Sequence, residues 1–152
     1  MKIQDITSLL ENTAPLSLQE DYDNAGLLTG NLSWECTGVL VSLDATEDIV
    51  AEAVEKKCNL IVAHHPIVFK GLKKITGKNY VEQTIIRAIK NDIAIYAIHT
   101  NLDNIISGVN GMIADLLGLV NRKILSPKAD LLKKLAVFVP VAGKEKLLEA
   151  LF

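Results

Sequence analysis

The sequence has few of the features that mark disulfide-rich, nucleic-acid-binding or membrane proteins. Its 152 residues include only two cysteines, Cys36 and Cys58, which are far apart and form neither a zinc-ribbon pair nor a disulfide framework. The net charge is -2 with acids and bases well mixed, so no basic stripe is available for a phosphate backbone. No apolar run approaches the length of a membrane span. We therefore expect a cytoplasmic protein that binds neither nucleic acid nor a membrane.

Aromatic residues are also scarce, at 5% of the chain, whereas hydrophobic residues as a whole make up 49%. This composition suits a soluble α/β domain, and a chain of this length can bury one good core. Near the amino terminus, charged and apolar residues alternate at helical spacing, which predicts a helix that ends before Pro15 rather than a signal peptide. Residues 20–31, rich in acids, Asn and Gly, are expected to form a loop.

From residue 38 onward the pattern alternates between strands and helices. Short apolar runs predict strands at residues 38–44, 60–63 and 93–98. Helical spacing predicts amphipathic helices after Thr46, from Val81 to Ile89 and after Gly108. Repeated strand–helix–strand units imply right-handed crossovers, and hence a largely parallel sheet with flanking helices and two buried faces.

All three histidines of the chain directly follow predicted strands. His64 and His65 come after residues 60–63, and His99 comes after residues 93–98 and shortly before Asp103. Ligands of open α/β sheets bind beyond the carboxyl ends of the strands, so these side chains can meet there. Imidazole with carboxylate suits zinc, manganese, iron or nickel. We predict that His64, His65 and Asp103 converge on metal.

Each histidine also has a structural interpretation. A single histidine at a strand end is more often a hydrogen-bonded structural residue than a ligand, and this favours a structural role for His99 taken by itself. Adjacent His64 and His65 are costly to leave unpaired, and Pro66 should hold His65 extended, so that the two rings diverge. Diverging rings can each serve a different ion, which suits a dinuclear centre with Asp103 as the candidate bridging carboxylate.

Other polar residues are interpreted structurally. Asp44 ends a strand, and with Thr46 it is expected to open the next helix, the alternative being that it orients a ligand or a water. Asp23 belongs to a polar turn that lacks the spacing of a calcium loop. Four lysines of the loop after His65 could attract an anionic substrate, but a solvated loop is favoured; they are Lys70, Lys73, Lys74 and Lys78.

The pattern breaks near residue 121. We interpret residues 1–125 as one α/β domain, residues 126–134 as a linker, and residues 135–152 as the beginning of a further domain, with a strand at 135–141 and a helix from residue 144. A strand and a helix cannot bury themselves alone. The segment from about Ser126 is therefore expected to be mobile or to pack against another molecule, with self-association as the simplest case.

Four motifs, in this order and spacing, resemble those of the NIF-three-like family, also called GTP cyclohydrolase I type 2 homologues or dinuclear-metal-centre proteins. They are Asp23-Asn24-Ala25-Gly26-Leu27-Leu28-Thr29-Gly30, Asp44-Ala45-Thr46, His64-His65-Pro66-Ile67-Val68-Phe69 and His99-Thr100-Asn101-Leu102-Asp103. The resemblance runs from Met1 to about Leu119. It implies an α/β fold, a toroidal homohexamer and a site for two divalent ions (zinc, iron, manganese or nickel). Its ligands would correspond to His64, His65 and Asp103, with His99 beside the metals.

The resemblance also has a gap. The family completes its site with a later His and Glu, and no histidine follows His99 here. Residues 135–152 resemble the start of the ferredoxin/PII-like domain that longer members insert. Two functions stay open: a hydrolase of a nucleotide or phosphoester-like small molecule that uses metal-activated water, or a non-catalytic metal-binding scaffold or regulator acting through its oligomer. No nucleotide-binding glycine loop is present.

Overall fold

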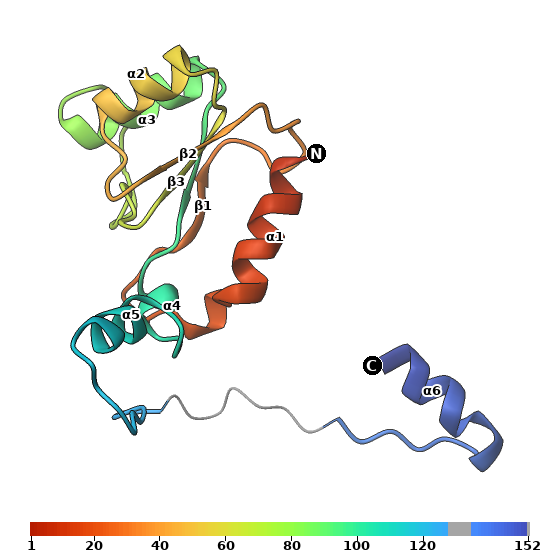
Figure 1. The fold of residues 1–152 in the computed structure, drawn as a ribbon. Helices are drawn as coiled ribbons and strands as arrows, with labels where there is room; N and C mark the ends of the chain where they lie inside the picture. The colour runs from red at the N-terminus through yellow and green to blue at the C-terminus, as the bar shows by residue number, and fades with distance from the viewer. Residues whose placement is uncertain (128–134, 152) are drawn as a thin grey trace.

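The structure, a computed structural model, describes residues 1–127 and 135–151. Its centre is one four-stranded sheet in the order β1-β4-β3-β2, flanked by helices (Figure 1). The strands are β1 (Gly26–Thr29), β2 (Val39–Ser42), β3 (Leu60–Ala63) and β4 (Ala94–Ala97). β2, β3 and β4 run parallel, and β1 pairs antiparallel with β4. The predicted largely parallel α/β sheet is thus confirmed.

β1 corrects the expectation that residues 20–31 form a loop. The strand has only four residues, and both Gly26 and Gly30 have positive φ values, of 108° and 97°. A Cβ at Gly30 would collide with Ala94 of β4, so glycine allows the close approach of the two strands. In the sequence, glycines at these positions are typical of a loop. In the structure, they stand at the two ends of β1 and allow this edge strand to lie close to β4.

Two apolar layers cover the two faces of the sheet. On one face α1 (Ile3–Thr13) lies beside the sheet, and on the other lie α2 (Glu47–Glu55) and α3 (Tyr80–Lys90) (Figure 1). β3 and β4 are buried along their whole length. At the edge, however, Val41 of β2 is 76% exposed, because among the described residues no β2 side chain joins the layer under α1. The expected burial of both faces therefore holds for the central strands only.

The predicted helices are present and begin where local chemistry favours it. The Thr46 hydroxyl accepts a hydrogen bond from the Ile49 amide at the start of α2. At the start of α3 the Asn79 side chain accepts one from the Glu82 amide. A 3-10 turn, η1 (Leu16–Leu18), lies between α1 and β1. After β4 come the short helix α4 (Thr100–Asp103) and then α5 (Val109–Leu116), which begins directly after Gly108.

The carboxyl-terminal segment differs from expectation. Residues 135–140 have no regular structure, and a 3-10 turn, η2 (Val141–Gly143), precedes α6 (Lys144–Leu151). The prediction of a strand at 135–141 is wrong. A strand requires a hydrogen-bonded neighbour, and no described residue pairs with this segment. Most of the linker, 128–134, and Phe152 lie outside the described residues. In the part of the chain that is described, no helix has the length and apolar character needed to cross a membrane.

Candidate metal centre

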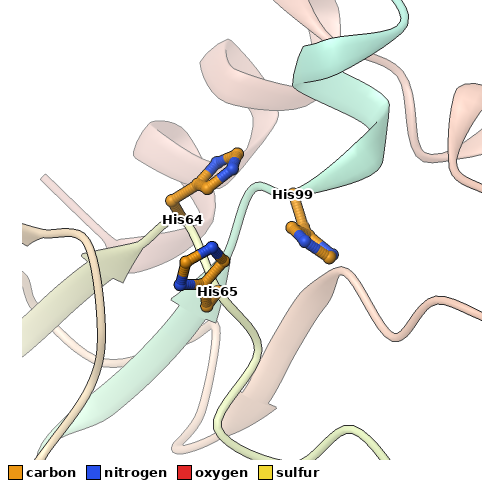
Figure 2. A group of neighbouring side chains, drawn as sticks. All are labelled: His64, His65 and His99. Atoms are coloured by element: carbon orange, nitrogen blue, oxygen red, sulfur yellow. The ribbon is translucent and has the colours of Figure 1, made fainter. Parts of the chain in front are cut away.

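The parallel strands β3 and β4 bring all three histidines to one edge of the sheet (Figure 2). Their register pairs Ala63 with Ala97, so the chain leaves both strands at the same level. The ring centroids are 4.9 Å apart for His64 and His65, 5.2 Å for His64 and His99, and 5.6 Å for His65 and His99. One nitrogen from each ring lies within 4.8 Å of the others. His99 thus belongs to the cluster and is not an isolated structural residue.

The prediction that His64 and His65 diverge is wrong. Their rings are neighbours tilted by 51°. The reason is that the strand ends at Ala63 and both histidines lie in a bend, where the alternation of a pleated strand no longer applies. The two side chains therefore face a common point.

Each imidazole is fixed through its Nδ1 atom. The Nδ1 of His64 lies 3.0 Å from the Ile98 carbonyl oxygen, and the Nδ1 of His65 lies 2.8 Å from Asp44 Oδ1. The Nδ1 of His99 lies 2.8 Å from Asp23 Oδ1. Because all three partners are acceptors, each Nδ1 carries the proton and donates it. In the neutral form of each ring this leaves Nε2 with the lone pair that a metal-binding histidine requires.

The Asp23 side chain, which is 0% exposed, holds His99 from the inner side of the cluster, while the His99 side chain stays 18% exposed. Its carboxylate also accepts hydrogen bonds from the amides of Asn24 and Thr100, at 2.7 and 3.1 Å, and from the Thr100 hydroxyl. Burial raises the pKa of Asp23, but the hydrogen bonds from His99, Thr100 and Asn24 outweigh it and hold the pKa below its ordinary value. An ionised carboxylate therefore fixes His99. The sequence assigned Asp23 only to a polar turn; the pairing of Gly26 with Ala97, had β1 been recognised, would have placed it near His99.

Asp44 has a different role from the one expected. Thr46 caps α2 with its own side chain, and the Asp44 carboxylate instead accepts the hydrogen bond of the His65 ring. Asp44 therefore orients a histidine, which is the alternative that the sequence left open. It is far more accessible than Asp23, with a side chain that is 57% exposed.

Asp103 lies at the end of α4, with Oδ1 3.9 Å from Nε2 of His64. That helix is anchored from both sides. The Asn101 side chain donates to the Ala14 carbonyl at 2.7 Å and accepts from the His99 amide at 2.9 Å, while the Asn104 side chain donates to the Leu18 carbonyl at 2.8 Å. Asp103 thus lies beside His64, whereas the donor atoms grouped within 4.8 Å of one another belong to His64, His65 and His99 and do not include Asp103. The distance of 3.9 Å is too long for a hydrogen bond and leaves room for a shared ion.

The donor set fits a divalent cation. Three imidazole nitrogens and a carboxylate oxygen are ligands that zinc and similar ions prefer. Two nitrogens bound to one tetrahedral ion lie about 3.3 Å apart, since each is about 2.0–2.1 Å from it. The observed spread of up to 4.8 Å is therefore wider than the spacing of nitrogens bound to a single ion. The exposed fraction of these imidazoles, from 18% for His99 to 47% for His65, gives an ion access to the cluster.

Fold and site together define an α/β protein with a histidine cluster at the carboxyl edge of a mostly parallel sheet. The chain belongs to the Duf34/NIF3 (NGG1p interacting factor 3) family, whose model matches residues 1–149. It is similar to proteins named GTP cyclohydrolase 1 type 2 homolog. The one from Clostridium acetobutylicum is 38% identical over 137 residues, which are 90% of this chain and 51% of the relative. One from Staphylococcus aureus is 42% identical over 140 residues, 92% of this chain and 38% of the relative.

Solved structures agree with the fold. A Bacillus cereus protein related to NIF3 has a TM-score of 0.78 and 42% identity, with 84% of this chain and 35% of that one covered. Reduced HcgD from Methanocaldococcus jannaschii has a TM-score of 0.76 and 31% identity, with 83% and 50% covered. The chain thus spans about half or less of the length of these relatives.

Proposed function

We propose that this chain binds divalent metal at the histidine cluster and acts as a metal-dependent hydrolase of a nucleotide or phosphoester-like small molecule. The observation that carries the proposal is the common arrangement of His64, His65 and His99, each fixed through Nδ1 and grouped within 4.8 Å. The name of the relatives, GTP cyclohydrolase 1 type 2 homolog, supports a hydrolytic reaction on a nucleotide. That name describes the relatives, and the substrate of this chain is part of the proposal.

The residues of the site would have two roles, which are to hold the metal and to orient the histidines that hold it. The Nε2 atoms of His64, His65 and His99 would hold the metal, and Asp103, 3.9 Å from His64, would add a carboxylate that two ions can share. A bound divalent ion would lower the pKa of a bound water and so supply a nucleophile at neutral pH. Asp23 and Asp44 keep His99 and His65 in the orientation and tautomer that ligation needs. Because three imidazoles and one carboxylate are few donors for two ions, we expect this chain to retain two ions weakly.

A second candidate is the non-catalytic scaffold, and the surface of α5 favours it. Met112 and Leu116 of α5 are 64% and 87% exposed, and Leu117, directly after the helix, is 69% exposed. Contiguous exposed apolar patches usually mark interaction sites. We propose that the chain self-associates through such surfaces, the homohexamer being the assembly that the resemblance implies. Light scattering coupled to size-exclusion chromatography measures this, and a monomer at all concentrations would contradict it.

One experiment separates the two functions. The chain is loaded in turn with zinc, manganese, iron and nickel, and the bound metal is measured by elemental analysis. The loaded protein is then assayed against panels of nucleotides and phosphoesters. Hydrolysis that is lost in His64→Ala, together with the metal, supports the hydrolase, whereas stoichiometric metal without turnover supports the scaffold. A wild-type chain that binds no metal at micromolar concentration would refute both.

A further inference from the structure

Two aromatic rings stand exposed beside the histidine cluster, in a chain with few aromatic residues. Tyr22 and Phe69 are 65% and 45% exposed, and their ring centroids are 6.3 Å apart with a tilt of 47°. Phe69 also meets His99 edge to face, with centroids 6.5 Å apart and planes at 79°. Large aromatic side chains normally gain stability by burial, so such a pair next to a candidate metal centre calls for a function.

The aromatic pair is held in register with the cluster by consecutive residues. Tyr22 contacts Phe69, and the next residue, Asp23, fixes His99 through a hydrogen bond of 2.8 Å. The residue after that, Asn24, donates from its side chain to the Val68 carbonyl at 2.6 Å. One short segment therefore clamps both histidine-bearing loops. The position of the two rings relative to His99 is set by the same hydrogen bonds that organise the site.

Phe69 also lies in a groove that contains a positively charged side chain. The groove, of about 370 Å³, is lined by residues that include Pro66, Ile67, Phe69, Lys70 and Tyr80. The groove offers apolar contact for the body of a small molecule and one cation for an anionic substituent. A small molecule held at the histidines would therefore lie beside Phe69, which also lines the groove and contacts Tyr22.

We propose that Tyr22 and Phe69 form an aromatic wall that selects ligands in which a planar aromatic ring carries the metal-binding oxygen group. This inference rests on the proposed function, because the oxygen group is taken to bind metal at the histidines. Flat rings gain from stacked or edge-to-face contact with aromatic side chains beyond what their buried area provides. A saturated ring with the same oxygen donor lacks this gain, so the wall acts on ligand choice and leaves metal binding unchanged.

The test uses the full chain loaded with Co²⁺, whose visible absorption band reports both metal binding and ligand exchange. The probes are benzoate and cyclohexanecarboxylate, which share a donor group, charge and ring size but differ in planarity. Phe69→Leu and Tyr22→Leu are compared with the wild type. The matched control is Phe138→Leu, an exposed phenylalanine in residues 135–140, a segment that contributes no residue to the site. Circular dichroism and thermal midpoints establish that each variant is folded.

We expect Phe69→Leu to weaken benzoate binding roughly two- to tenfold, with cyclohexanecarboxylate and Co²⁺ affinity unchanged. Tyr22→Leu should act in the same direction, and Phe138→Leu should leave both ligands unaffected. If the ratio of the two ligand affinities is unchanged in Phe69→Leu and Tyr22→Leu, the aromatic wall is overturned, whereas an intact cobalt band still supports the metal centre. The same unchanged ratio is expected if another protein chain covers the two rings. Absence of the band in the wild type rejects the metal centre and the wall together.

Discussion

Replacing Asp23 with Asn tests how far the cluster depends on one buried carboxylate. The substitution keeps the size of the side chain, and the amide oxygen can still accept the His99 hydrogen bond. The amide nitrogen, however, must then face donors, because the Thr100 amide and the Thr100 hydroxyl both donate to the second carboxylate oxygen. One buried N–H group is left without an acceptor, and the charge that strengthened the other bonds is lost.

The expected size of the effect follows from these contacts. A buried donor without a partner costs about 1–3 kcal/mol, so we expect Asp23→Asn to lower the free energy of unfolding by about 2 kcal/mol. Loss of a group that orients a metal-bound histidine typically lowers metal affinity about 10- to 100-fold. The first quantity is measured by urea unfolding of the metal-free chain. The second is measured by competition for Zn²⁺ with a chromophoric chelator.

Asp21→Asn is the matched control, since Asp21 is an exposed carboxylate in the same segment. It removes the same charge without touching His99, and we expect neither quantity to change by more than about 0.5 kcal/mol, as is usual for surface substitutions. If Asp23→Asn binds Zn²⁺ as tightly as the wild type, or if Asp21→Asn loses as much affinity, the Asp23 carboxylate does not act through His99.

Three further predictions concern the scaffold around the site. Thr46→Ala should lower the free energy of unfolding by about 1 kcal/mol in urea titrations, because it removes the cap of α2; Thr46→Ser should restore most of it. Gly30→Ala should lower the thermal midpoint, since its φ of 97° and the close approach of β4 exclude a side chain; an unchanged midpoint would show that the edge strand can shift. Hydrogen bonds from the backbone of Thr76 and Lys78 lower the pKa of Glu82 in the folded chain. The ionised Glu82 side chain therefore stabilises the fold fully above its ordinary pKa, and this stabilisation is lost as the pH falls through the lowered pKa of the folded state. Glu82→Gln should therefore make unfolding less dependent on pH in the acid range, and equal acid profiles would contradict this.

The central strands and the histidines could be predicted because their signals are local. Buried parallel strands are continuous apolar runs, and Leu60–Ala63 was predicted at its observed bounds. A histidine directly after such a run lies at the carboxyl edge of the sheet whatever the rest of the fold, so the convergence of His64 and His99 followed from topology alone.

The remaining features depend on partners far away in the sequence. The contact between Asp23 and His99 spans 76 residues and exists only because β1 pairs with β4. The direction of the His65 ring is set by Asp44, 21 residues earlier, and by a bend that strand periodicity cannot describe. The strand expected at 135–141 failed for a related reason. The segment has the apolar pattern of a strand, but a strand forms only with a hydrogen-bonded neighbour, and the pattern does not show whether such a neighbour exists.

The three imidazoles are not equivalent, and the difference follows from what holds each of them. His64 is fixed by a backbone carbonyl, whereas His65 and His99 are fixed by carboxylates, which strengthen a histidine as a metal ligand more than a neutral acceptor does. Of the two carboxylates, the Asp23 side chain is fully buried and the Asp44 side chain is 57% exposed, so water weakens the second much more than the first. His64 in turn is the ring nearest to Asp103, at 3.9 Å, and this neighbouring carboxylate compensates for its neutral partner. Every histidine of the cluster thus has one negative group close to it, placed on a different element of the fold in each case: the segment before β1, the turn after β2 and the end of α4.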